Sequence, residues 1–241
     1  MHTVEEIKQS IRLLSATERE NIATWLSGAT DSSFTVAEPA PAYANSPVSP
    51  LPTADEYLEF EQTADVRHEF VAGTLYAMAG PSKSHNLIAG NLFATLHGHL
   101  RGGPCNAYVS DIKLRLKAGH DDLFYYPDVM VACEREAASE YYLQLPKLII
   151  EVLSPSTEKT DRREKALNYR QIATLEEYVL VAQNRPHVEI QRRADDWRPT
   201  LVTSLDATAE FRSIGLSLPL TQIYEDTHVS TSAIKTGSVE F

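Results

Sequence analysis

One acidic residue lies in the middle of a strand that is otherwise apolar. The segment Leu148–Leu153 reads LIIEVL, and Glu151 is its only polar residue. Because alternate side chains of a strand share a face, this carboxylate projects beside Ile149 and Leu153 from a hydrophobic surface. Burying a carboxylate is costly unless a cation or a full set of hydrogen bonds compensates. Glu151 is therefore either half of a structural ion pair with an arginine of the following helix or part of a functional site.

A second acidic residue is expected on a neighbouring strand. Asp128 follows a proline within the strand predicted over Phe124–Ala132. If Asp128 and Glu151 project to the same side of adjacent strands, they repel each other and a positive group must hold them together. A hard divalent cation such as Mg²⁺ or Mn²⁺, which prefers oxygen ligands, meets that need. The two acids therefore predict a metal site, with a backbone carbonyl near Val152 as a further ligand.

Three other residues are weaker candidates. Asp111 is on the polar face of a strand predicted over Tyr108–Leu116. This position fits a solvated surface residue and a metal ligand equally well. Glu69 precedes a predicted hairpin and would help the metal through water. His85 begins a helix predicted from Pro81 to about Leu100, and a histidine there caps or packs more often than it catalyses.

A basic segment follows the Glu151 strand and is predicted to be helical over 160–172. Lys159 directly precedes this helix, and the basic residues within it are Arg162, Arg163, Lys165 and Arg170. One interpretation is a solvated face held by pairs four residues apart, such as Asp161 with Lys165. The other uses the short connection from the strand, which brings the first turns of the helix close to the acids. Lys165 would then reach the metal site, while Arg162 and Arg163 would face a phosphate backbone.

The chain divides into four segments by composition. Residues 1–28 are predicted to form two short helices that pack on the main domain or on a second subunit, and 29–52 are a Pro-rich linker. A domain over 53–226 and a flexible tail over 227–241 follow.

Within the domain, strands and helices alternate in a way that is typical of an α/β fold. Glu177–Ala182 is predicted to be a second buried central strand, and His187–Gln191 is predicted to form a hairpin with Leu201–Ser204.

The composition excludes several classes of protein. Hydrophobic residues make up 43% and charged residues 23%, which is a globular balance. No apolar run approaches the ~20 residues that cross a bilayer. Two cysteines without CxxC spacing argue against a disulfide framework and fit a cytoplasmic location. The net charge of -11 disfavours non-specific nucleic-acid binding, but a local basic strip and bound cations permit a nuclease.

Several motifs, taken in order, resemble the Uma-two family of restriction endonuclease-like proteins in the PD-(D/E)XK nuclease superfamily. The resemblance covers roughly residues 53–205. The motifs are Glu69, GTLYAMAGPSKSHN, SDIKLRL, YYPDVMVAC, LIIEVLSPST, DRREK with Tyr169, and LEEYVLV. The resemblance implies a restriction-endonuclease-like central mixed β-sheet flanked by helices, with the short N-terminal helical pair outside it.

The resemblance also implies roles for single residues. Asp128 corresponds to the Asp of the PD motif and Glu151 to the second acid. The superfamily places a lysine two residues after that acid, where this chain has Leu153. The resemblance therefore gives the lysine role to Lys165 of the following helix, with Lys159 as the less favoured stand-in. Glu69 matches a helix-borne glutamate that completes such sites.

The expected function is therefore that of a Mg²⁺-dependent (or Mn²⁺-dependent) endonuclease that hydrolyses phosphodiester bonds. The expected partner is nucleic acid, with DNA as the first choice. No association with a membrane is expected. A homodimer is expected if both strands of a duplex are cut, because that reaction needs two sites. The alternative is a catalytically silent nuclease fold that acts as a binding module through its N-terminal helices. A serine hydrolase has no support, because the chain has no G-x-S-x-G motif.

Overall fold

The computed structural model describes residues 53–133 and 139–229. The predicted helices over 1–28, the predicted linker over 29–52 and the last part of the predicted tail, 230–241, lie outside the described residues. In the described part of the chain, no helix combines the length and the hydropathy needed to span a membrane.

The main sheet has six strands and is mixed, as the sequence predicted. Its strands, in order across the sheet, are β11 (Pro199–Val202), β10 (Val188–Arg192), β9 (Glu177–Ala182), β8 (Leu148–Leu153), β6 (Val129–Ala132) and β3 (Asn106–Val109). The central pair β8 and β9 is parallel, whereas β6 and β10 run antiparallel to their neighbours. Both central strands are buried along their whole length, which explains their nearly continuous apolar sequences.

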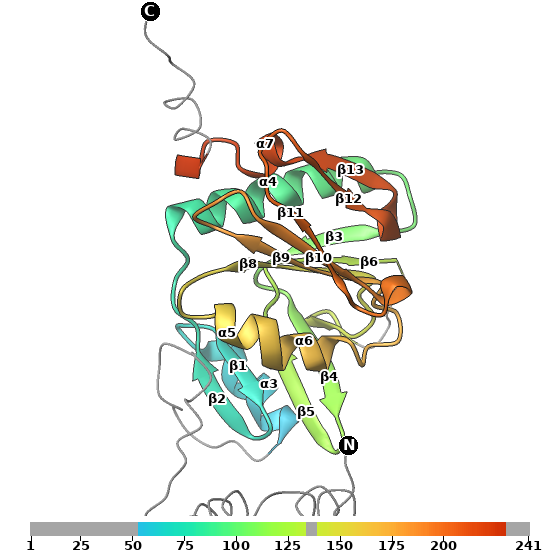
Figure 1. Cartoon of the computed structure of the whole chain (residues 1–241). Helices are drawn as coiled ribbons and strands as arrows, with labels where there is room; N and C mark the ends of the chain where they lie inside the picture. Colours follow the sequence, from blue (N-terminus) through green and yellow to red (C-terminus); the bar gives the residue numbers. More distant parts are fainter. Residues whose placement is uncertain (1–52, 134–138, 230–241) are drawn as a thin grey trace, which may run out of the picture. The chain divides into compact units, whose positions relative to one another are not determined.

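Helices cover both faces of this sheet (Figure 1). On one face lies α4 (Lys83–Leu100), and on the other lies a continuous helical segment made of α5 (Glu158–Thr160), a π-helical turn (Asp161–Lys165) and α6 (Ala166–Tyr169). The side chains of β8 alternate between two hydrophobic clusters. Residues 148, 150 and 152 pack with α4, and residues 149 and 153 pack with α6. Glu151 therefore points toward the basic helix.

A second sheet of five strands lies beyond that helix (Figure 1). Its order is β2 (Thr74–Ala77), β1 (His68–Val71), β5 (Asp121–Tyr125), β4 (Lys113–Ala118) and β7 (Tyr142–Leu143). The helix α3 (Ala54–Thr63) packs on it through Tyr57, which stacks on Phe70 with 5.1 Å between ring centroids.

Two strands that the sequence predicted as continuous are each divided between the two sheets. The segment 108–116 changes from β3 to β4, and the segment 124–132 changes from β5 to β6. The second break contains Pro127, which has no N–H for a sheet ladder. In the segment 108–116, polar and apolar residues already alternate from Asp111, within the break, so alternation alone could not reveal it. The change of sheet leaves Asp128 just ahead of β6, at the junction of the two sheets.

Local sequence signals mark several boundaries of these elements. Thr53 caps α3 and forms a capping box with Glu56, and Ser82 caps α4 by accepting from the N–H of His85. The β1–β2 hairpin turns at Ala72 and Gly73, with φ of 47° and 83°. Two left-handed residues in a two-residue loop match the twist of the flanking strands.

The sequence did not predict the last elements of the domain. These are the hairpin of β12 (Thr208–Phe211) with β13 (Leu216–Pro219), followed by α7 (Leu220–Ile223). Their side chains join the cluster on the α4 face, where Phe211 and Tyr224 are fully buried. At the start of the segment predicted to be a flexible tail, Thr227 and Val229 are also buried.

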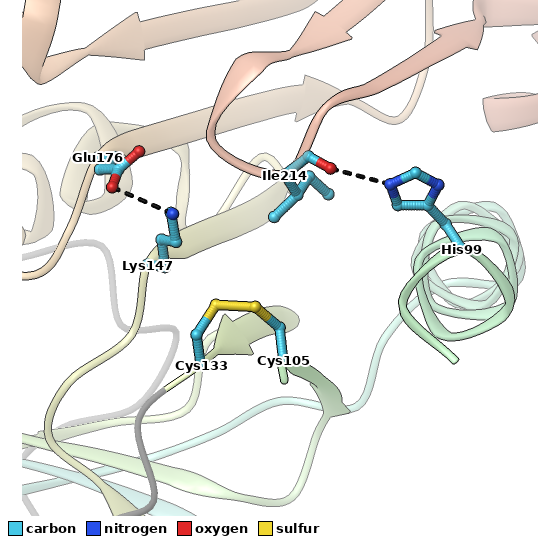
Figure 2. The surroundings of a disulfide bond; sticks show 6 residues. All are labelled: His99, Cys105, Cys133, Lys147, Glu176 and Ile214. Carbon is cyan, nitrogen blue, oxygen red and sulfur yellow. Dashed lines mark hydrogen bonds and ion pairs between the residues drawn. A yellow bond between two sulfur atoms is a disulfide. The ribbon is translucent and has the colours of Figure 1, made fainter. Parts of the chain in front are cut away.

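A disulfide joins Cys105 and Cys133 (Figure 2). The pairing follows from the sheet, because Asn106 lies opposite Ala132 in the β3–β6 ladder and the cysteines are the next residues outward. The sequence argued against a disulfide framework, and the structure corrects this for the one pair of cysteines, since no sequence spacing reveals a cross-strand neighbour. The cysteine-based reason for a reducing location therefore no longer holds.

The disulfide should stabilise the domain. Closing a loop of 28 residues removes chain entropy from the unfolded state, and such a crosslink contributes about 3 kcal/mol. Reductant should lower the free energy of unfolding by about that amount in urea titrations. The C105S/C133S variant should match the reduced protein and show no response to reductant; an equal response of both proteins would contradict the assignment.

Candidate active site

A single buried lysine lies among three carboxylates. The Nζ atom of Lys165 lies 2.9 Å from Glu69, 3.2 Å from Glu151 and 3.2 Å from Asp161. The lysine is 5% exposed, and burial alone would lower its pKa. The carboxylates outweigh burial and raise the pKa of Lys165 well above its usual value, so it is an ammonium group.

Glu151 has the environment that its sequence position predicted. It is 3% exposed, and its Oε1 accepts from Lys165 at 3.2 Å and from the Tyr169 hydroxyl at 2.9 Å. Its Oε2 accepts from the N–H of Asp128 at 3.4 Å. Burial raises the pKa of Glu151, Lys165 lowers it, and three nearby acids raise it again, with a net rise. The partner of Glu151 is thus a lysine and not the arginine of the structural alternative.

Asp128 lies next to Glu151 and is the residue just ahead of the adjacent strand β6. Its Oδ2 accepts from the N–H of Val152 at 2.7 Å and lies 3.3 Å from Nε2 of His85. Burial lowers the pKa of His85, but Asp128, Asp161 and the backbone of Val152 raise it, with a net rise. His85 thus approaches the acids from the first turn of α4.

Glu69 reaches the cluster from a strand and not from a helix. The resemblance implied a helix-borne glutamate, but Glu69 lies in β1, opposite Tyr76 of β2. Its Oε1 also accepts from the N–H of Tyr126 at 3.3 Å. The buried acid of helix α3 is Glu61, whose carboxylate accepts from the hydroxyl of Tyr126 at 2.7 Å and from the N–H of His68 at 2.9 Å.

Sequence reasoning missed two members of the site. Asp161 was interpreted as part of a solvated face, but it is 2% exposed and lies in the π-helical turn. Tyr169 is fully buried and donates to Glu151. The spacing of Asp161, Lys165 and Tyr169 is four residues each, which places them on one face of a helix. That face follows a strand with a buried acid, and this signal could have identified both residues.

Other predicted site residues are not in the cluster. Asp111, a predicted metal ligand, pairs with Arg67 at 3.4 Å, and its side chain is 56% exposed. Arg162 pairs with Glu158 and Glu189. Arg163 is exposed one residue further along the same turn.

The charges of the site suit a divalent cation held partly by water. Within the described residues, no group of three or more His, Cys, Asp or Glu side chains is arranged to hold a metal ion by itself. Mg²⁺ is commonly held by one or two carboxylates together with waters. Asp128 and Glu151 supply that number. The N–H of Asp128 donates to the carboxylate of Glu151, and the N–H of Val152 donates to the carboxylate of Asp128, so the two acids are held together. Four acids surround the two basic side chains of Lys165 and His85, so carboxyl groups outnumber basic groups in the cluster.

The fold and this site together define the class of protein. The chain has the α/β fold of restriction-endonuclease-like proteins. A crystal structure from Anabaena variabilis, described as "a putative nuclease belonging to DUF820", is similar to this chain, with a TM-score of 0.59 and 18% sequence identity. The match covers 70% of this chain and 96% of that one. This likeness concerns the fold.

The sequence profile of the Uma2 family, "Putative restriction endonuclease", matches residues 54–221. The chain therefore belongs to the Uma2 family. Two Synechocystis proteins are similar to it. "Uncharacterized protein slr1290" is 36% identical over 75% of this chain and 96% of that protein. "Uncharacterized protein sll1609" is 35% identical over 66% of this chain and 92% of that protein.

Replacing Lys165 with methionine should destabilise the domain at neutral pH. The change leaves Glu69, Glu151 and Asp161 buried without their ammonium partner, which costs about 3–5 kcal/mol. Without the lysine, the folded-state pKa of Glu151 and Asp161 rises further above the unfolded value, because Lys165 lowers both.

The folded variant then holds protons that the unfolded chain releases, so its stability falls as pH rises. Urea unfolding at pH 5 and pH 8 should show the larger loss at pH 8. Lys159→Met, at an exposed position of the same helix, should change little at either pH. An equal loss for the two variants would contradict the central role of Lys165.

Proposed function

We propose that this chain is a metal-dependent endonuclease that hydrolyses phosphodiester bonds of nucleic acid, with DNA as the first expected substrate. The observation that carries the proposal is the distance of 3.2 Å between Nζ of Lys165 and Glu151, with Asp128 hydrogen-bonded to the same strand. The two acids and the lysine are the residue types that phosphodiester hydrolysis at a PD-(D/E)XK site requires. Membership of the Uma2 family supports the same class of reaction.

Asp128 and Glu151, with the carbonyl of Val152, would hold Mg²⁺ or Mn²⁺. When bound, the ion supplies a Lewis acid for a phosphoryl oxygen and lowers the pKa of a water. Lys165 would offset charge that develops on the phosphoryl group, since it is an ammonium group already in place. Glu69 would supply a counter-charge to that ammonium group, at 2.9 Å.

His85 would contribute to substrate binding at the same side of the site. Its ring lies 3.3 Å from Asp128, and its side chain is 15% exposed, so a phosphate near Asp128 would come within reach of the imidazole ring. Arg163 is the preferred residue for binding the phosphate backbone, because its side chain is exposed. Arg162 is less suited to this role, because it already pairs with two carboxylates.

The catalytic assignment predicts that the acids are indispensable. Asp128→Ala and Glu151→Gln should each lower Mn²⁺- or Mg²⁺-dependent cleavage of a DNA and RNA panel by at least about 100-fold, because each removes a ligand and a charge from the reacting centre. Calorimetric titration with Mn²⁺ should show binding to the wild type and its loss in both variants.

Asp111→Asn is the matched control. Its carboxylate pairs with Arg67 and not with the cluster, so cleavage and Mn²⁺ binding should stay at the wild-type level. If Asp128→Ala cleaves as fast as the wild type, the assignment is wrong. If the wild type binds neither Mn²⁺ nor Mg²⁺ and leaves the whole panel intact, the chain is a nuclease fold that serves as a binding module.

The two arginines should differ in their effect. Arg163→Gln should weaken nucleic-acid binding and reduce the slope of log affinity against log salt by about one, the change expected for one lost phosphate contact. Arg162→Gln should lower thermal stability instead, because Glu158 and Glu189 lose their partner. Fluorescence anisotropy over a salt series measures the first effect and thermal unfolding the second. Equal salt slopes for the two variants would contradict this division of roles.

A homodimer would supply two sites for cutting both strands of a duplex. Sedimentation analysis with and without DNA tests this expectation, and a monomer in both conditions would restrict the activity to one strand at a time.

A further inference from the structure

Asp161 is a buried acid that the proposed reaction does not use. Its side chain is 2% exposed and its Oδ1 lies 3.2 Å from Nζ of Lys165. That oxygen has no partner in hydrogen-bond geometry, so the contact with the lysine is an ion pair without an aligned hydrogen bond. The side chain also interacts with Thr157, one helical turn earlier.

Charge compensation alone does not explain Asp161. Glu69 and Glu151 already lie within 3.2 Å of the lysine, so the ammonium group has more than one counter-charge without it. A third buried carboxylate adds repulsion toward Glu69, Asp128 and Glu151, and it adds a desolvation cost. A group that costs stability in this way and lies next to a candidate catalytic amine has a role in positioning that amine.

The geometry points to Asp161 as the positioning residue that holds the Lys165 amine when Glu151 is engaged by the cation, a role that rests on the proposed function. Glu151 and Glu69 approach the lysine from two different sheets, whereas Asp161 belongs to the same helix, four residues earlier. A cation at Glu151 competes with Lys165 for that carboxylate. Asp161 then keeps the ammonium group in place, because it moves with the helix that carries the lysine.

Asp161→Asn, which keeps the shape of the side chain and removes its charge, tests this role. We expect kcat for the most rapidly cleaved nucleic acid of the panel to fall about 100-fold, the loss typical of a misplaced catalytic group. KM and the Mn²⁺ affinity from calorimetry should stay within about threefold, since Asp128 and Glu151 are intact. Thermal stability should not fall, because a repulsive buried charge is removed.

Glu158→Gln is the matched control on the same helix. Glu158 pairs with Arg162 and its side chain is 45% exposed, so kcat should be unchanged. An unchanged kcat in Asp161→Asn would overturn the proposal. A loss of Mn²⁺ binding in that variant would also overturn it, because Asp161 would then be a ligand of the metal.

A second measurement does not depend on activity. Nitrogen-15 spectra selective for lysine ammonium groups should show a slowly exchanging Lys165 signal in the wild type, assigned by its absence in Lys165→Met. The spectra are then recorded with saturating Mg²⁺, which is diamagnetic, in place of the Mn²⁺ used for calorimetry. The Lys165 signal should persist in the wild type and broaden beyond detection in Asp161→Asn. If it persists equally in both, Asp161 does not hold the amine. If the wild type cleaves nothing but the signal responds as expected, the endonuclease proposal fails while the positioning role stands.

Discussion

The buried ammonium group of Lys165 is the contact on which the site depends. It joins Glu69 of the five-stranded sheet to Glu151 of the six-stranded sheet, and it is carried by the helix that lies between them. Each carboxylate would be too costly to bury alone, and the lysine would be too costly without them. The relative placement of the two sheets and of the helix is therefore tied to one cation.

The surroundings of this cation hold the helix at a defined register. Tyr169 packs edge-on between Tyr125 and Tyr178, with 5.5 Å and 5.3 Å between ring centroids. The hydroxyl of Tyr178 donates to the backbone oxygen of Asp161 at 2.9 Å. On the outer side, Arg170 donates to Gln191 at 2.7 Å. These contacts hold the helix that carries the lysine on several sides, and a catalytic group must be held to within ~0.5 Å of its productive position.

The acids outnumber the cations around this point, and that imbalance links the fold to the proposed chemistry. Glu151 and Asp161 both have a raised pKa because burial disfavours their charged forms. A divalent cation at Asp128 and Glu151 would relieve the repulsion between these acids. A structure built only for stability would replace such a cluster with apolar side chains at little cost.

The amino-acid sequence by itself determined the local features: the capped helices, the hairpin at Ala72, the apolar strands β8 and β9, and the acid inside β8 that signals a site. The choice of Asp128, Glu151 and Lys165 followed from motif resemblance and short connections. Only the tertiary structure decided that Glu69 comes from a strand, that Asp161 is buried, and that Asp111 pairs with Arg67. It alone decided that two apparent strands divide between sheets and that Cys105 meets Cys133. The physical reason is that periodicity reports which side of an element is apolar, whereas the partner that covers a side chain is set by residues distant in the chain.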